Sequence, residues 1–367
     1  MFDRRLVQYF DWWLLLLTLV IAAIGLALIY SSVNAGEASL PSKTHLRQAS
    51  WLGIGMLVMV LSFCFSFKKL DRWSPFVYTV CIGLLIAVLL AGKTVGGSTR
   101  WLDLGLFVLQ PSEPAKIGVI LIMAHYFAKK VRPGGMGFRE LVWPLVLSIV
   151  PFGLIWMQPD LGTGLLIILI TGSMALFAKI ERRTFLILLV AGVIIVPLGW
   201  FIIEDYQRTR ILMLFAPESD PRGAGYHILQ SKIAVGSGMI YGKGFMEGTQ
   251  NILSFLPEQH TDFIFSVLAE EWGFAGSAGL LILFFLLVSF GLNIAHGCRD
   301  DFGTILAFGI TSMIFWQSVI NIGMVIGLIP VVGMPLPLVS YGGSSVITSL
   351  LGIGILLNIS MRRFVKD

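Results

Sequence analysis

The sequence has little charge for its length. Of its 367 residues only 13% are charged, whereas 56% are hydrophobic, and the mean hydropathy is +0.85. Soluble globular domains carry about 25% charged residues, so this composition excludes an ordinary soluble fold. Apolar runs of about 18 residues, long enough to cross a bilayer, recur along the chain. The sequence predicts an all-α polytopic membrane protein, with residues 1–367 forming one integral membrane domain.

Cysteines and nucleotide-binding motifs are also scarce. Cys64, Cys81 and Cys298 lie in or beside apolar runs and show no CxxC or metal-ligand spacing. This pattern predicts neither disulfides nor a structural metal. The glycine-rich run 236–244 lacks the strand–helix context of a Walker or Rossmann loop and is expected to be a flexible loop that approaches a ligand. The net charge of +5 comes from loop cations that topology explains, so we expect no nucleic-acid partner.

Ten apolar runs predict about ten transmembrane helices. The expected spans are residues 12–30, 51–67, 76–91, 115–128, 141–157, 161–178, 184–203, 274–296, 303–329 and 338–360. The first run is long and lacks a small-residue cleavage site, so we expect a retained anchor and no cleaved signal peptide.

The distribution of Lys and Arg predicts the orientation of these spans. Most of these cations fall in loops on the side that holds both termini, which predicts that both termini are cytoplasmic. Residues 204–262 then form a large extracytoplasmic loop between spans seven and eight. The cations on the inner side include Arg4, Arg5, Arg132, Arg183 and Lys366.

Ionisable residues are absent from the interior of most spans. Between Asp301 and Arg362 there is no Asp, Glu, Lys or Arg. Ion-coupled transporters and pumps usually place such groups at mid-membrane depth, whereas here they stand at the outer ends of helices. This placement favours chemistry at the outer leaflet over a proton relay through the bilayer.

The polar segment ends at Asp262, directly before the apolar run 263–269, which is expected to form a short helix ahead of span eight. One interpretation makes Asp262 the N-cap of that helix. The other makes it a general base that takes a proton from a sugar hydroxyl as the oxygen attacks. Because the usual Asp pKa of about 3.9 is low for that task, we expect partial burial to raise it. The nearby Glu258 and His260 could tune the site, although such side chains are more often solvated or paired.

Two outer helix starts carry further candidates. Ser112 can cap the fourth span, and structural roles explain this stretch adequately. Glu113 and Lys116 are three residues apart and share a helix face, so they could also contact a sugar–pyrophosphate headgroup. Asp160 opens span six, where a capping role is favoured over a role in the site.

The remaining candidates lie in the long polar segment and between the last two spans. Arg208, Arg210, Lys232 and Lys243 are each ordinary solvated cations when taken singly, but together they could neutralise a pyrophosphate. The Pro- and Gly-rich run 330–345 predicts irregular backbone, which at membrane depth must be buried or line a cavity. We expect it to dip inward beside the site, although tight helix packing through small residues also explains it.

Several of these segments, in their order along the chain, are similar to the signature of the SEDS (shape, elongation, division and sporulation) family. They are Arg100–Trp101, Gln110–Glu113, Gln158–Thr163, Asp205–Arg208, Pro257–Phe263, Asn321–Gly323, Gly327–Pro330 and Leu338–Ser345. Three more segments resemble the elongation branch of that family in particular: Gly225–His227, Gln230–Ala234 and Gly248–Gln250.

The resemblance implies a GT-C-like peptidoglycan glycosyltransferase that polymerises lipid II at the outer face of the bacterial inner membrane and releases undecaprenyl pyrophosphate. It places the family's essential aspartate on Asp262, its important Glu and Lys on Glu113 and Lys116, and its loop tryptophan on Trp101. The other expected substrate-binding residues are Arg100, Asp160, Arg208, Arg210, Lys232, Lys243 and Ser340. A divalent cation, Mg²⁺ or Mn²⁺, could balance the pyrophosphate, but the sequence offers no firm ligand set.

The resemblance also implies partners: a class B penicillin-binding protein that crosslinks the new strands, and other membrane proteins of the elongation complex. Two other functions stay open at this point. A lipid II flippase would move the same headgroup without chemistry, although the charge-free spans argue against it. A scaffold would only anchor partner proteins, and the acidity of its loop would be incidental.

Overall fold

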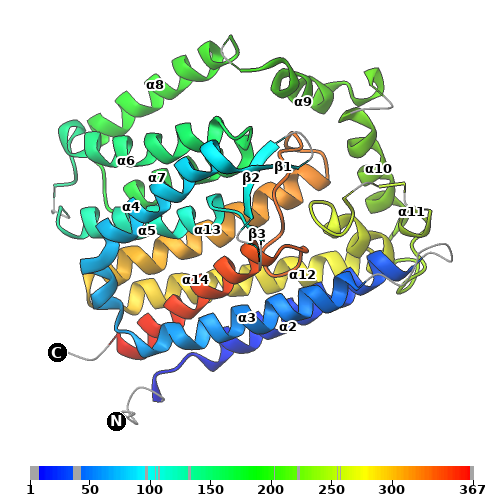
Figure 1. The fold of residues 1–367 in the computed structure, drawn as a ribbon, viewed down its shortest axis with the longest axis horizontal. Helices are drawn as coiled ribbons and strands as arrows, with labels where there is room; N and C mark the ends of the chain where they lie inside the picture. Colours follow the sequence, from blue (N-terminus) through cyan, green and yellow to red (C-terminus); the bar gives the residue numbers. More distant parts are fainter. Residues whose placement is uncertain are drawn as a thin grey trace.

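The structure is a computed structural model, and Figure 1 shows its bundle of helices. The described residues are 8–35, 43–95, 98–103, 105, 108–130, 134–201, 203–220, 224–253, 255–256 and 258–363. Five residues that entered the sequence argument lie outside this part of the chain: Arg4, Arg5, Arg132, Pro257 and Lys366.

Ten helices of at least 17 residues occur in the described chain, and each overlaps one predicted span. They are α2 (Trp12–Asn34), α3 (Thr44–Cys64), α4 (Phe67–Ala91), α5 (Ser112–Ala128), α6 (Phe138–Trp156), α7 (Leu161–Phe177), α8 (Arg182–Gly199), α12 (Ile264–Gly297), α13 (Asp301–Val325) and α14 (Gly343–Arg362). Among the described residues, eight of these helices are long and apolar enough to cross a membrane, and α7 is a shorter apolar helix. The helical, polytopic class is confirmed, and the count of ten spans stays a prediction.

The centre of the bundle is formed by α13 and α14. Most of their residues are buried, whereas Thr184 is the one buried residue among the described side chains of α8. Helix α14 packs against α3, and α13 packs against α12, α5 and α7. Figure 1 shows α8 at the outer edge, beyond α6 and α7. The central helices therefore form the core of the bundle, and α8 lies at its periphery.

Aspartates cap three of the long helices. The side chains of Asp11, Asp160 and Asp300 accept hydrogen bonds from backbone N–H groups in the first turns of α2, α7 and α13, at 3.1, 3.3 and 2.8 Å. The capping role expected for Asp160 is confirmed. The one expected for Ser112 is wrong, because α5 begins at Ser112 itself and the buried hydroxyl has no hydrogen-bond partner.

A small antiparallel sheet follows α4, where the sequence led us to expect only a loop. It comprises β1 (Lys93–Val95), β2 (Ser98–Asp103) and β3 (Val108–Leu109), in the order β1-β2-β3. The strands are short and rich in β-branched and aromatic side chains, which favour a pleated surface. The sequence did not indicate this sheet, and β2 fixes the positions of Arg100 and Trp101.

The described residues of the segment 204–262 are folded and gather at one end of the bundle. It contains α9 (Asp205–Phe215), the 3₁₀ turn η1 (Pro217–Ser219), α10 (Ala224–Ser237) and α11 (Thr249–Ile252). Figure 1 shows α9, α10 and α11 at the end opposite to the start of α2 and the end of α14. This arrangement agrees with a long segment on one side of the membrane and both termini on the other.

Helix α12 is bent where its two parts meet. Gly273 has φ 66° and ψ −158°, so residues 264–272 form a short helix ahead of the longer part 274–297, as the sequence predicted. The turn expected to be flexible is bonded to this bend, because Phe274 N and Ala275 N donate to the carbonyls of Met239 and Ile240 at 2.8 and 3.0 Å. The turn 239–242 and the bend therefore hold each other in place.

Candidate functional site

Asp262 lies one residue before the N-cap of α12. That N-cap is Phe263, and no side chain makes a capping hydrogen bond there, so the capping interpretation of Asp262 is wrong. Its carboxylate lies instead against Gly333, where an added Cβ would stand 3.3 Å from Oδ2. Gly333 belongs to the irregular segment 326–342 between α13 and α14, which therefore reaches the carboxylate, as the sequence led us to expect.

Three consecutive carbonyl groups ahead of α12 are held by α13 and the segment 326–342. The bonds are Tyr341 N to His260 O at 2.9 Å, Ser340 Oγ to Thr261 O at 2.6 Å and Asn321 Nδ2 to Asp262 O at 2.9 Å. Fixing three carbonyls in a row fixes the direction of the chain at Asp262. In this structure Ser340 therefore supports the backbone of the site.

The charges around Asp262 come from three separate parts of the chain. Burial is the largest influence and raises the pKa of Asp262 to about 6, and the negative charge of Glu258 adds to the rise. Arg100 and Arg210 act in the opposite direction, and Asp160 contributes a smaller rise. The predicted elevation of this pKa is confirmed. A carboxyl group with this pKa is mostly ionised at pH 7 and is still basic enough to accept a proton.

Arg100 connects β2 to the start of α7. Its Nε donates to Gln158 O at 3.3 Å, its Nη2 donates to Pro159 O, and its Nη1 lies 3.7 Å from Asp160 Oδ1. Asp160 Oδ2 is buried and has no hydrogen-bond partner. Arg100 and Asp160, which are far apart in sequence, thus form one charged pair whose field acts on Asp262.

Arg210 reaches the site from α9. Its guanidinium lies 5.9 Å from the centre of the Tyr206 ring, and its Nη1 donates to Val331 O at 3.1 Å. The hydrogen bond to Val331 uses one of the five N–H groups of Arg210, so others stay available to an anion. The site therefore contains two arginines, Arg100 and Arg210, beside the carboxylate of Asp262.

Two side chains of the site were not among the sequence candidates for substrate binding. Glu258 was expected either to tune the pKa of Asp262 or to be solvated or paired, and its charge does raise that pKa. His227 of α10 stacks on Phe263, with ring centroids 6.1 Å apart and planes at 13°. Burial and the charge of Arg210 lower the pKa of His227, so its ring is neutral at pH 7. The segment Gly225–His227 was noticed only as part of a family resemblance, and no spacing rule connects it to Asp262.

Three predicted cations have other neighbours. Arg208 pairs with Asp205 at 3.2 Å, and Lys243 pairs with Glu270 at 2.7 Å. Lys232 is exposed on α10, and the end of its side chain lies against Gly327. The charged groups that dominate the pKa shift of Asp262 do not include these three. Of the four cations proposed from the long segment, the structure brings Arg210 to the carboxylate.

Glu113 and Lys116 form a buried pair. Their side chains are only 3% and 2% exposed, and Lys116 Nζ lies 3.0 and 2.9 Å from the two carboxylate oxygens of Glu113. The same Nζ donates to Gln317 Oε1 of α13 at 3.1 Å. The pair therefore points into the bundle, whereas Trp101 on β2 is partly exposed.

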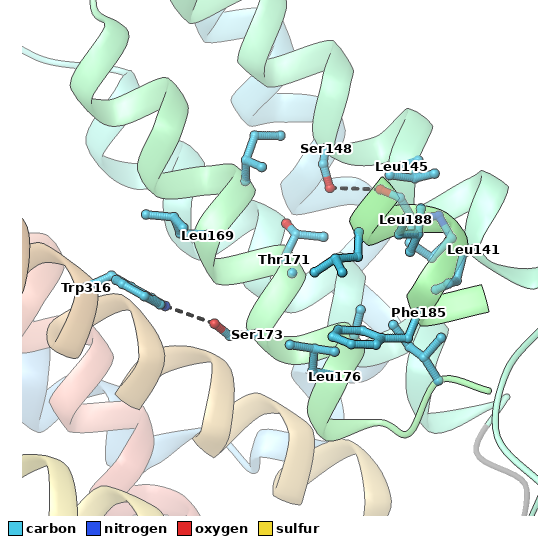
Figure 2. A pocket seen from close by; sticks show the side chains of 16 residues that line it. Leu141, Leu145, Ser148, Leu169, Thr171, Ser173, Leu176, Phe185, Leu188 and Trp316 are labelled. Atoms are coloured by element: carbon cyan, nitrogen blue, oxygen red, sulfur yellow. Dashed lines mark hydrogen bonds between the residues drawn. The ribbon is translucent and has the colours of Figure 1, made fainter. Parts of the chain in front are cut away.

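An apolar cavity of about 570 Å³ lies between α6, α7, α8 and α13. Figure 2 shows its wall of leucines with Phe185 and Trp316, whose indole N–H donates to Ser173 Oγ at 2.9 Å. Thr171, at the centre of the wall, is eleven residues beyond Asp160, roughly 16 Å along α7. The cavity is thus separate from the charged cluster at Asp262, and its lining suits a hydrocarbon chain.

Comparison with known proteins identifies the group to which the chain belongs. Residues 11–364 match the sequence profile of the FtsW/RodA/SpoVE family of cell cycle proteins. The chain belongs to the FtsW/RodA/SpoVE family. The resemblance drawn from the motifs is therefore confirmed, and it extends over nearly the whole chain.

Relatives of the family agree in sequence and in fold. The peptidoglycan glycosyltransferase MrdB of Escherichia coli K12 is 45% identical over 319 residues, which is 86% of this chain and 85% of that protein. A chain of a peptidoglycan synthase complex that coordinates polymerization and crosslinking is similar with a TM-score of 0.83 and 31% identity, covering 97% of this chain and 99% of the other. The rod shape determining protein RodA of Thermus thermophilus gives a TM-score of 0.71 at 29% identity, with 97% and 98% coverage.

Proposed function

We propose that this FtsW/RodA/SpoVE family member is a peptidoglycan glycosyltransferase that joins lipid II units into glycan strands during cell elongation. The observation that carries the proposal is the setting of Asp262. Its carboxylate is held against Gly333, has a pKa raised to about 6 and lies in the field of two arginines. The names of the similar proteins support the same reaction class.

The proposed step is a single displacement at a sugar. The 4-hydroxyl oxygen of GlcNAc on an incoming lipid II attacks the anomeric carbon of MurNAc at the reducing end of the growing strand. Asp262 accepts the hydroxyl proton while the new C–O bond forms. The bond to undecaprenyl pyrophosphate breaks, and the pyrophosphate leaves with the electron pair. One displacement on an α-linked donor inverts the anomeric centre, which gives a β-1,4 bond.

We assign the leaving pyrophosphate to Arg100 and Arg210. Both guanidinium groups lie close enough to Asp262 to lower its pKa, and guanidinium forks match phosphate oxygens. Trp101 follows Arg100 on β2 and is partly exposed, so its ring could pack on a sugar. The apolar cavity of Figure 2 is proposed to take up part of a lipid hydrocarbon chain. The remaining predicted contacts stay predictions: Glu113, Lys116, Asp160, Arg208, Lys232, Lys243 and Ser340.

No proposed step is routed through a metal ion. Across the part of the chain that the structure describes, no group of three or more His, Cys, Asp or Glu side chains is placed to hold one. The acidic neighbours of Asp262, Glu258 and Asp160, act on it through their charge. An Mg²⁺ or Mn²⁺ counter-ion to the pyrophosphate therefore stays a proposal without an assigned ligand set.

We place the reaction at the outer face of the bacterial inner membrane, with both termini in the cytoplasm. The excess of Lys and Arg on the side of the termini supports this orientation. We also propose a class B penicillin-binding protein as partner, together with other elongation-complex membrane proteins. The similarity to a chain of a peptidoglycan synthase complex supports an assembled enzyme.

The test is polymerisation of labelled lipid II by the purified protein in vesicles. Wild-type protein should give products of higher mass, and Asp262→Asn should give none while it elutes as a folded monodisperse species. Polymerisation by Asp262→Asn would remove the assignment of the base. Lipid II that changes leaflet with unchanged mass would identify a flippase instead.

A further inference from the structure

Two buried amides on α13 contact the backbone around Asp262 and residues 334–335. Gln317 and Asn321 are four residues apart, so they lie one turn apart on the same face of the helix. Their side chains are 1% and 0% exposed. Asn321 Oδ1 is buried without a hydrogen-bond partner, whereas the NH₂ groups of both amides donate to carbonyls, and these donated bonds show what the two side chains hold.

Asn321 joins the backbone of the proposed base to the segment that packs against it. Its Nδ2 donates to Asp262 O at 2.9 Å and to Met334 O at 2.6 Å. Both acceptors are carbonyls, which cannot donate, so the NH₂ group must face them. Met334 follows Gly333, the residue against the Asp262 carboxylate. One side chain therefore sets the spacing between the base and the wall of its pocket.

Gln317 repeats this arrangement one turn earlier. Its Nε2 donates to Pro335 O at 3.0 Å, and its Oε1 accepts from Lys116 Nζ at 3.1 Å. Lys116 in turn binds both carboxylate oxygens of Glu113. A continuous chain of polar contacts thus leads from the buried Glu113–Lys116 pair through Gln317 to Pro335, next to Met334.

We propose that Asn321 and Gln317 are positioning residues that hold residues 333–335 against Asp262, and that Glu113 and Lys116 act on the site through Gln317. This inference rests on the proposed role of Asp262 as the base. It gives a nearly fully buried ion pair a route to the site that needs no contact with the substrate. Without the two amides, residues 333–335 would move off the carboxylate and water would enter.

The first test replaces Asn321 and uses a matched control from the other end of the bundle. Asn358 of α14 is also buried, and its Nδ2 also donates to two carbonyls, those of Ser62 and Phe65. Asn321→Ala should lower kcat about tenfold or more, change KM for lipid II less than about threefold, and move the acidic limb of the pH–kcat profile to lower pH, because burial raises the pKa of Asp262. Asn358→Ala should lower the melting temperature without moving that limb.

Gln317→Glu is a second variant that preserves size. It keeps an acceptor for Lys116 but loses the N–H that binds Pro335 O, so it should lower kcat and shift the acidic limb in the same direction. If Asn321→Ala and Gln317→Glu both keep the wild-type kcat and pH profile, or if Asn358→Ala shifts the profile equally, the inference is overturned. Activity in Asp262→Asn would instead overturn the assignment of the base, so the two failures are distinguishable.

Discussion

At the scale of single residues, the protonation of Asp262 decides when the proposed reaction can run. With a pKa of about 6, the group is mostly in the ionised form that can accept a proton above that pH and mostly protonated below it. We expect kcat/KM to fall about tenfold per pH unit below 6, because the ionised fraction of the free enzyme falls by that factor. A pH–kcat/KM profile for lipid II checks this, and a limb centred near pH 4 would contradict it.

The same pKa predicts an effect on stability. The folded-state pKa lies above the unfolded value of about 3.8, so the folded protein binds the proton more tightly. The contribution of Asp262 to the free energy of unfolding should therefore be largest below about pH 4. It should fall by at most about 3 kcal/mol as the pH rises to about 6. Asp262→Asn should then melt higher than wild type at pH 7.5 and at the same temperature at pH 3.8 or below. A lower melting temperature at pH 7.5 would count against burial as the cause.

Gly333 predicts a second effect on the base. Its φ is 70°, and an added Cβ would stand 3.3 Å from Asp262 Oδ2. Gly333→Ala introduces backbone strain of about 1–2 kcal/mol and also crowds the carboxylate. We therefore expect it to lower kcat by more than a variant that introduces the same strain alone. Gly105→Ala is the matched control, since Gly105 has φ 81° and nothing within 4 Å of an added Cβ. Equal activity of the two variants would show that crowding is unimportant.

At the scale of elements, the bend in α12 links the membrane helix to the reacting end of the chain. An added Cβ at Gly273 would collide with Gly242 N and Ile240 O, and ψ −158° with φ 66° is open almost only to glycine. Gly273→Ala should lower the melting temperature and displace the short helix that follows Asp262. Gly279→Ala on the same helix meets nothing within 4 Å and should leave both properties unchanged. If both variants lost stability, the bend at Gly273 would not be the cause, and the loss would come from added side-chain volume along α12.

The elements of this fold were predictable to different degrees. Each long helix had an apolar run behind it, because burial in lipid demands about 20 apolar residues in a row. The sheet β1–β3 was missed, since its strands are short and their pairing depends on how the chain folds back. The helices α9 and α10 were also missed, because their sequences are polar enough to be taken for loop. The site residues on helix starts followed from position, whereas Glu258, His227 and Asn321 depend on contacts between distant segments.

At the scale of the whole molecule, the orientation of the chain in the membrane can be measured by labelling its two sides. Tyr241 is 84% exposed in the turn beside α12, and Arg183 is exposed at the start of α8. With Cys64 and Cys298 replaced by serine, Tyr241→Cys should react with a membrane-impermeant maleimide on intact spheroplasts, and Arg183→Cys should react only after lysis. The reverse pattern would put Asp262 on the cytoplasmic side and end the proposal.

The sequence by itself determined that this protein is a helical bundle in a membrane, since the hydrophobic effect acts on composition and run length alone. It also placed Asp262 at the edge of a helix and indicated the family. Only the tertiary structure decided which charges surround that carboxylate and that Glu113 and Lys116 face Gln317. Those relations join residues that are up to about 200 positions apart in the chain, and a burial-dependent pKa exists only after packing has removed the water.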